Sequence, residues 1–203
     1  MRGISTTALT LAALGLWAVG PAAAQESTTR GFNIGLHLSA ASVTFEDQDR
    51  NDAGGAGLSL GYGFNRRFTL FAQLDAAEFD EQATGNVEGD LVMGHAELGV
   101  RFYFANSLSK WVPYLQGALG GRVVSVQNPV VGGTGRNEVS YSGSALTLGG
   151  GLGYYLSRSW ALDVQLLWTG GEFTTLTVDN ASVSGFEVDA NSTRFNVGVN
   201  WWP

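Results

Sequence analysis

The chain has 203 residues, a length that suits one domain with a sizeable core. Hydrophobic residues make up 44% of it, charged residues only 14%, and the net charge of -7 argues against nucleic acid as a partner. With 29 Gly, 4 Pro and no Cys, the sequence excludes a disulfide framework and any metal site built on thiolates.

Residues 1–24 have the organisation of a secretory signal peptide. Arg2 supplies a positive start, residues 4–19 carry no charge and are mostly apolar, and Pro21 precedes the small residues 22–24. The alternative is an uncleaved membrane anchor, which the short apolar run disfavours because a spanning helix needs about 20 apolar residues. We therefore expect a signal peptide over 1–24 and a single domain over 25–203.

After this segment, the chain alternates between apolar and polar residues in eight stretches. Their ranges are 32–41, 57–64, 68–76, 90–105, 113–123, 146–156, 160–169 and 194–202. This period of two predicts strands with one apolar and one polar face. Short connections at 65–67, 106–110 and 157–159 alternate with long ones at 46–52, 81–89, 125–143 and 170–191. The expected fold is all-β: eight antiparallel strands in an up-and-down barrel, because closure removes unpaired edges.

A soluble barrel would turn the apolar face inward, and a membrane barrel would turn it outward. The polar face mixes single charged residues with Gly, Ala and Ser, which suits the crowded interior of a narrow barrel. The apolar face carries no charge, and a charge in mid-membrane would cost about 2–4 kcal/mol. Aromatic residues typical of an interfacial girdle gather near the short connections: Phe64, Phe68, Phe104, Trp111, Tyr154, Trp160 and Trp201. We therefore expect a transmembrane β-barrel.

This arrangement resembles the small outer-membrane β-barrel family, which includes OmpA-like and OmpX-like transmembrane barrels. The resemblance is carried by the eight alternating strands, by the run PYLQGALG over 113–120 and by the final RFNVGVNWW over 194–202. It implies a bacterial outer-membrane location with both termini and the short turns in the periplasm. It also implies three partners, namely outer-membrane lipids, lipopolysaccharide and the barrel-assembly machinery, and it identifies no surface ligand.

Seven charged or titratable residues of the polar face are expected to point into the barrel. They are His37, Asp75, Glu97, Arg101, Arg122, Asp163 and Arg194. Because a buried, unpaired charge costs several kcal/mol, we expect them to form an interior ion-pair network that fills the barrel.

The preferred function is therefore a non-enzymatic one, with a structural or surface-interaction role. A small-solute porin is the first alternative. A lipid-modifying enzyme is the second, since His37 and Ser39 share a face and Glu97 or Asp75 could orient the imidazole.

No metal or cofactor is expected. The acidic segment 47–52 resembles a calcium loop, but Asp52 stands where the turn needs Gly, and Leu58 stands where a bidentate Glu is required. The glycine-rich segment 132–135 lacks the strand-to-helix context of a phosphate-binding loop.

Overall fold

The structure is a computed structural model that describes residues 29–45, 51–79, 88–104, 109–130, 139–178 and 181–203. The expected signal peptide at 1–24 and the glycine-rich segment 132–135 lie outside these residues, as does most of the calcium-like segment 47–52. Within the described ranges, no helix is long and apolar enough to cross a membrane.

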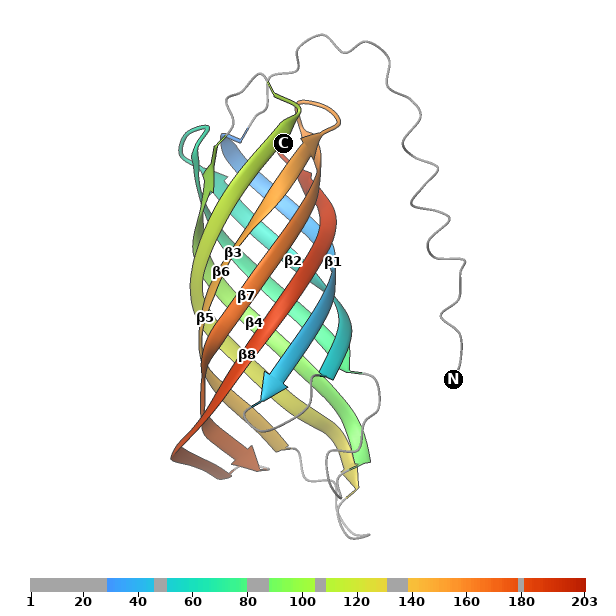
Figure 1. Ribbon diagram of the computed structural model, residues 1–203, viewed down its shortest axis with the longest axis vertical. Helices are drawn as coiled ribbons and strands as arrows, with labels where there is room; N and C mark the ends of the chain where they lie inside the picture. The colour runs from blue at the N-terminus through green and yellow to red at the C-terminus, as the bar shows by residue number, and fades with distance from the viewer. Residues whose placement is uncertain (1–28, 46–50, 80–87, 105–108, 131–138, 179–180) are drawn as a thin grey trace, which may run out of the picture.

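Eight antiparallel strands form one closed barrel, in which each strand pairs with its neighbours in sequence (Figure 1). The strands are β1 (Gly31–Phe45), β2 (Asn51–Gly63), β3 (Phe68–Phe79), β4 (Glu88–Tyr103), β5 (Trp111–Val130), β6 (Val139–Tyr155), β7 (Trp160–Val178) and β8 (Ala181–Trp201). The barrel closes where β1 pairs with β8, from Ile34 opposite Trp201 to Phe45 opposite Ala190. The predicted eight-stranded up-and-down topology is confirmed.

The β2–β3 and β6–β7 connections are tight turns at one end of the barrel, the upper end in Figure 1, which we call the short-turn end. In the β2–β3 turn, the Asn65 Oδ1 atom accepts hydrogen bonds from the amides of Arg67 (2.8 Å) and Phe68 (3.0 Å). Ser157 acts similarly in the β6–β7 turn, where its Oγ atom accepts from the Trp160 amide at 3.0 Å. Local side-chain acceptors therefore end the strands sharply here.

Two of the long connections are much shorter than predicted, because the strands continue through them. β5 extends to Val130 and β6 begins at Val139, so the expected connection at 125–143 is mostly strand. β7 and β8 likewise continue through 170–191, and their far ends reach beyond the rest of the barrel at the lower left of Figure 1. These Ser- and Thr-rich ends lack a regular apolar face, so alternation could not reveal them. A register shift between Phe173 and Thr175 interrupts the pairing there.

The apolar face of the sheet points outward. Leu36 and Leu119 on this face are 60% and 68% exposed, whereas inward-facing Gln73 and Arg194 are each 1% exposed. The alternation is regular along the whole of β3, with exposed and buried residues in strict turn. The barrel is therefore apolar outside and polar inside, as a membrane-spanning sheet requires.

The interior is layered along the barrel axis. At the short-turn end, an aromatic layer is formed by Tyr103, Val112, Tyr114, Tyr155, Ala161 and Trp202. At the other end, an apolar layer is formed by Ala41, Ala53, Ala77, Phe79, Met93, Val124, Phe173 and Ala190. The buried charged residues of β1, β3, β4 and β8 lie between the two layers. Side chains thus fill the interior, as expected for eight strands.

Candidate functional site

We call the buried polar and charged side chains between the aromatic and apolar layers the polar layer. One of its contacts joins two strands that are not neighbours. His37 on β1 and Asp75 on β3 are both paired with Gly57 of the intervening β2. The His37 Nε2 atom lies 2.5 Å from the Asp75 Oδ1 atom, and both side chains are buried. A Cβ atom on residue 57 would lie 2.2 Å from His37 Nε2 and 2.3 Å from Asp75 Oδ1, so glycine is what allows this contact.

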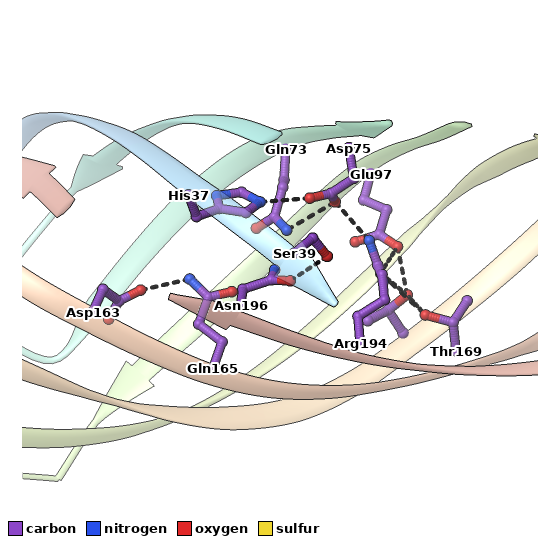
Figure 2. Close-up of polar contacts among 11 residues, drawn as sticks. His37, Ser39, Gln73, Asp75, Glu97, Asp163, Gln165, Thr169, Arg194 and Asn196 are labelled. Atoms are coloured by element: carbon purple, nitrogen blue, oxygen red, sulfur yellow. Dashed lines mark hydrogen bonds and ion pairs between the residues drawn. The ribbon is translucent and has the colours of Figure 1, made fainter. Parts of the chain in front are cut away.

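Arg194 on β8 is the centre of the polar layer (Figure 2). Its Nη1 atom donates to Asp75 Oδ2 at 2.5 Å, and its Nη2 atom donates to Glu97 Oε1. The same Nη2 atom also lies 3.1 Å from the Thr169 hydroxyl and 3.3 Å from the Thr147 hydroxyl. One guanidinium, 1% exposed, therefore bonds two carboxylates from β3 and β4 and two hydroxyls from β6 and β7.

Around this centre, neutral side chains add hydrogen bonds to the same carboxylate oxygens that Arg194 binds. Gln73 donates to Asp75 Oδ2 at 2.9 Å, and the Thr147 hydroxyl donates to Glu97 Oε1 at 2.6 Å. These bonds matter because a buried charge is tolerated only when its hydrogen-bonding capacity is largely used.

The structure thus brings together four of the seven predicted interior residues, His37, Asp75, Glu97 and Arg194. The other three, Arg101, Arg122 and Asp163, also point inward and are at most 4% exposed. They lie at other levels of the barrel with other kinds of partner, so the described part of the interior is not one continuous set of ion pairs.

Arg101 lies toward the short-turn end and stacks on aromatic rings. Its guanidinium carbon is 4.4 Å from the centre of the Tyr114 ring and 5.0 Å from that of Phe71. Its Nε atom donates to Gln116 at 3.0 Å. Asp163 accepts from the Tyr114 hydroxyl at 2.9 and 3.0 Å and from Gln165 at 2.5 Å. Aromatic and amide groups therefore replace direct ion pairs at this level.

Arg122 lies toward the long-connection end and binds backbone. Its Nη2 atom donates to the carbonyl oxygens of Gly171 and, at 2.7 Å, Ala190. The guanidinium carbon is 4.4 Å from the centre of the Phe173 ring. Arg122 therefore ties β5 to β7 and β8 just before these two strands extend outward.

The arrangement needed by a hydrolase does not form around His37. The Ser39 hydroxyl donates to Asn196 Oδ1 at 2.7 Å, while His37 contacts Asp75 (Figure 2). Both His37 and Ser39 are 7% exposed, inside the barrel and away from the outward lipid-facing surface. In this geometry no base activates the serine, and no substrate-accessible face presents it. Within the described residues, no group of three acidic or histidine side chains is placed to hold a metal ion.

Three residues that hydrogen-bond to Arg194, Asp75 or Glu97 were not among the predicted site residues: Gln73, Thr147 and Thr169. All three face inward on strands in which apolar and polar residues alternate, so this alternation could have identified them. Uncharged residues carry no pairing requirement that would draw attention to them in a sequence.

The predicted aromatic girdle lies on the outward face at the short-turn end. Phe64, Phe68, Phe104, Trp111, Trp160 and Trp201 are all exposed, between 37% and 61%. Tyr154 is half-buried because its ring packs 4.5 Å from that of Trp111. Phe32, Tyr62 and Phe102 belong to the same outward band.

The sequence matches the model of a known protein family. The model of the outer membrane protein beta-barrel domain family matches residues 9–201, nearly the whole chain. The chain belongs to this family. No curated protein matches the sequence closely enough to count as a relative.

Solved structures share the fold of the family at low sequence identity. Neisserial surface protein A superposes with a TM-score of 0.62 at 17% identity, covering 84% of this chain and 96% of that one. Ail, the attachment invasion locus protein of Yersinia pestis, gives 0.55 at 15% identity, covering 85% and 99%. OprG of Pseudomonas aeruginosa gives 0.50 at 12% identity, covering 87% and 96%. The predicted family and the fold of an outer-membrane barrel are confirmed.

Proposed function

We propose that the protein is a non-enzymatic outer-membrane barrel, closed to solutes, with a structural or surface-interaction role. The observation that carries this proposal is the bonded polar layer around Arg194, which lies between an aromatic layer and an apolar layer. Packed apolar side chains exclude water, and the direct bonds of Arg194 to Asp75 and Glu97 oppose a continuous column of water through the layer between them. The proposal therefore disfavours a small-solute porin.

The proposed orientation places the short-turn end and both termini in the periplasm, after removal of the signal peptide. It is supported by the girdle at the short-turn end and by strands β5 to β8, which extend furthest at the opposite end (Figure 1). Lipopolysaccharide is the proposed partner of the outer end, and the barrel-assembly machinery is the proposed partner during insertion.

The extended ends of β7 and β8 are the proposed contact surface. Ail has been crystallised with a heparin analogue, sucrose octasulfate, at 16% identity and a TM-score of 0.55 to this chain. On this chain, the exposed Glu172 and Asp189 lie opposite each other on β7 and β8. Two carboxylates at this position repel a polyanion, so the proposed surface contact is not of the heparin type.

Planar-bilayer recording on refolded protein tests closure. We expect no steady conductance from the wild type. Glu97→Ala removes one acceptor of Arg194 and should produce brief openings, whereas Glu78→Ala, an exposed acid on β3, should leave the recording silent. Large, stable wild-type channels that Glu97→Ala does not change would overturn the proposal in favour of a porin.

A further inference from the structure

A motif recurs at the short-turn end of all four odd-numbered strands. Each strand is preceded or begun by a cation, followed within two residues by an outward aromatic residue. The four pairs are Arg30 with Phe32, Arg67 with Phe68, Lys110 with Trp111, and Arg158 with Trp160. Because the odd strands alternate with even ones around the closed barrel, the four units are distributed over its whole circumference.

In each unit, the aromatic residue is paired directly with another aromatic residue on the next strand. The register places Phe32 opposite Tyr62, Phe68 opposite Phe102, Trp111 opposite Tyr154, and Trp160 opposite Trp201. Their ring centroids are 4.9, 5.1, 4.5 and 5.9 Å apart, in that order. Each cation therefore lies within two residues, along the chain, of a packed aromatic pair that faces away from the barrel.

The backbone beside three of these cations is held in place. The Arg67 carbonyl accepts from the Tyr103 amide at 2.8 Å, and the Lys110 carbonyl accepts from the Tyr155 amide at 2.9 Å. Beside Arg30, the Thr29 hydroxyl donates to the Arg66 carbonyl at 2.7 Å. The backbone at Arg67 and Lys110, and next to Arg30, is therefore tied to the neighbouring strand or turn.

Charge is separated between the two ends of the barrel. Within the described residues, the cations that do not point into the barrel all lie at the short-turn end: Arg30, Arg66, Arg67, Lys110 and Arg158. The exposed acids of the same residues all lie at the opposite end: Asp52, Glu78, Glu172 and Asp189. A chain with a net charge of -7 thus presents a cationic rim where its aromatic girdle meets the bilayer boundary.

We propose that the four cation–aromatic units are binding sites for the headgroups of anionic phospholipids of the phosphatidylglycerol type. A guanidinium or ammonium group donates to the phosphodiester oxygens. The aromatic platform lies at the depth of the glycerol and headgroup region, and the acyl chains follow the outward apolar face. The proposed orientation assigns these lipids to the periplasmic leaflet.

Lipid suits this arrangement better than a protein partner. The units are separate, similar and spread around the circumference. The aromatic residues of each unit lie on the same outward face as the apolar residues of their strands. A protein would cover one side of the barrel and leave units on the other side without a role. Individual lipid molecules can occupy all four units at once.

The test measures lipid selection directly. Refolded protein in mixed bilayers of phosphatidylcholine and phosphatidylglycerol is examined with spin-labelled lipids, and native mass spectrometry counts the retained lipids. At low salt, we expect about fivefold enrichment of phosphatidylglycerol at the protein surface, the ratio that corresponds to ~1 kcal/mol per cation near an anionic surface. The enrichment should decline as salt is added.

Matched variants separate this site from general charge effects. The variant with Arg30→Gln, Arg67→Gln, Lys110→Gln and Arg158→Gln should show a ratio near one. The control with Glu78→Gln, Glu172→Gln and Asp189→Asn, all exposed acids at the opposite end, should keep the wild-type ratio.

Single changes on one strand cover the case in which the fourfold variant does not fold. Arg67→Gln and Glu78→Gln lie at opposite ends of β3, and only Arg67→Gln should lose one retained lipid, which Arg67→Lys restores. A wild-type ratio of one, or an unchanged lipid count in Arg67→Gln, would overturn the proposal. Neither readout depends on conductance or on orientation, so both stand apart from the test of closure.

Discussion

Replacing Arg194 by methionine tests the polar layer most directly. Methionine keeps much of the side-chain volume but lacks the guanidinium group. In the wild type, that group bonds Asp75, Glu97 and two threonine hydroxyls. We expect Arg194→Met to fold into the same barrel with a lower free energy of unfolding.

The magnitude follows from what the two carboxylates retain. Breaking a buried ion pair from one side costs about 3–5 kcal/mol, because the remaining charge is left uncompensated. Here Asp75 keeps His37 at 2.5 Å and Gln73 at 2.9 Å, and Glu97 keeps the Thr147 hydroxyl at 2.6 Å. These partners soften the loss, so we expect a decrease of about 3 kcal/mol, the low end of that range.

Urea unfolding in lipid vesicles, followed by tryptophan fluorescence, measures this difference, with an unchanged slope showing that the same surface is exposed. The triple variant Arg194→Met, Asp75→Asn and Glu97→Gln should recover most of the stability, because it leaves neither Asp75 nor Glu97 as a carboxylate that has lost Arg194. Glu78→Gln, which removes an exposed charge on β3, is the control and should unfold like the wild type. If Arg194→Met costs less than about 1 kcal/mol, or if the triple variant is as unstable as the single one, Arg194 does not hold the layer together.

Two further substitutions test the faces of the sheet and the role of one glycine. Val197 is 47% exposed on the outward face, so Val197→Arg should lower the free energy of unfolding in vesicles by about 2–4 kcal/mol. The control Val197→Thr should lower it clearly less. Equal values for the two variants would mean that this face is not in lipid. Gly57→Ala should separate His37 from Asp75 and cost about 1.5–3 kcal/mol, the range of a hydrogen bond to a charged group, whereas Gly54→Ala has no atom within 4 Å of the new Cβ and should be neutral. Identical urea midpoints for the two alanine variants would show that glycine at position 57 is not needed for the contact between His37 and Asp75.

Sequence alternation could predict which residues point inward, because each strand keeps its period of two through the apolar band. It could also place His37, Asp75, Glu97 and Arg194 at one level, since each lies a similar number of residues from the short-turn end of its own strand. Those predictions depend only on the local geometry of each strand and on the position of the short-turn end, from which residues are counted.

Partners inside the barrel could not be predicted in the same way. The contact of His37 with Asp75 crosses a whole strand and depends on the absence of a side chain at Gly57. Arg101 stacks on Phe71 and Tyr114, a choice set by strand tilt and ring orientation. The far ends of β7 and β8 were missed because they lack one consistently apolar face. The first two failures concern geometry between strands, which a single sequence does not encode locally.

The distribution of cations links the interior to the two surfaces. The described part of the chain holds eight Arg and Lys residues, of which Arg101, Arg122 and Arg194 are buried in the barrel and the other five lie at the short-turn end. No Arg or Lys of these residues is therefore available to bind lipid phosphates directly at the long-connection end, where Glu172 and Asp189 are exposed. If that end contacts lipopolysaccharide, as proposed, Glu172, Asp189 and the phosphates are all negative, and a divalent cation between such a carboxylate and a phosphate would stabilise the contact, because like charges repel. The short-turn end needs no such ion, since its arginines and lysine can donate to phosphate themselves.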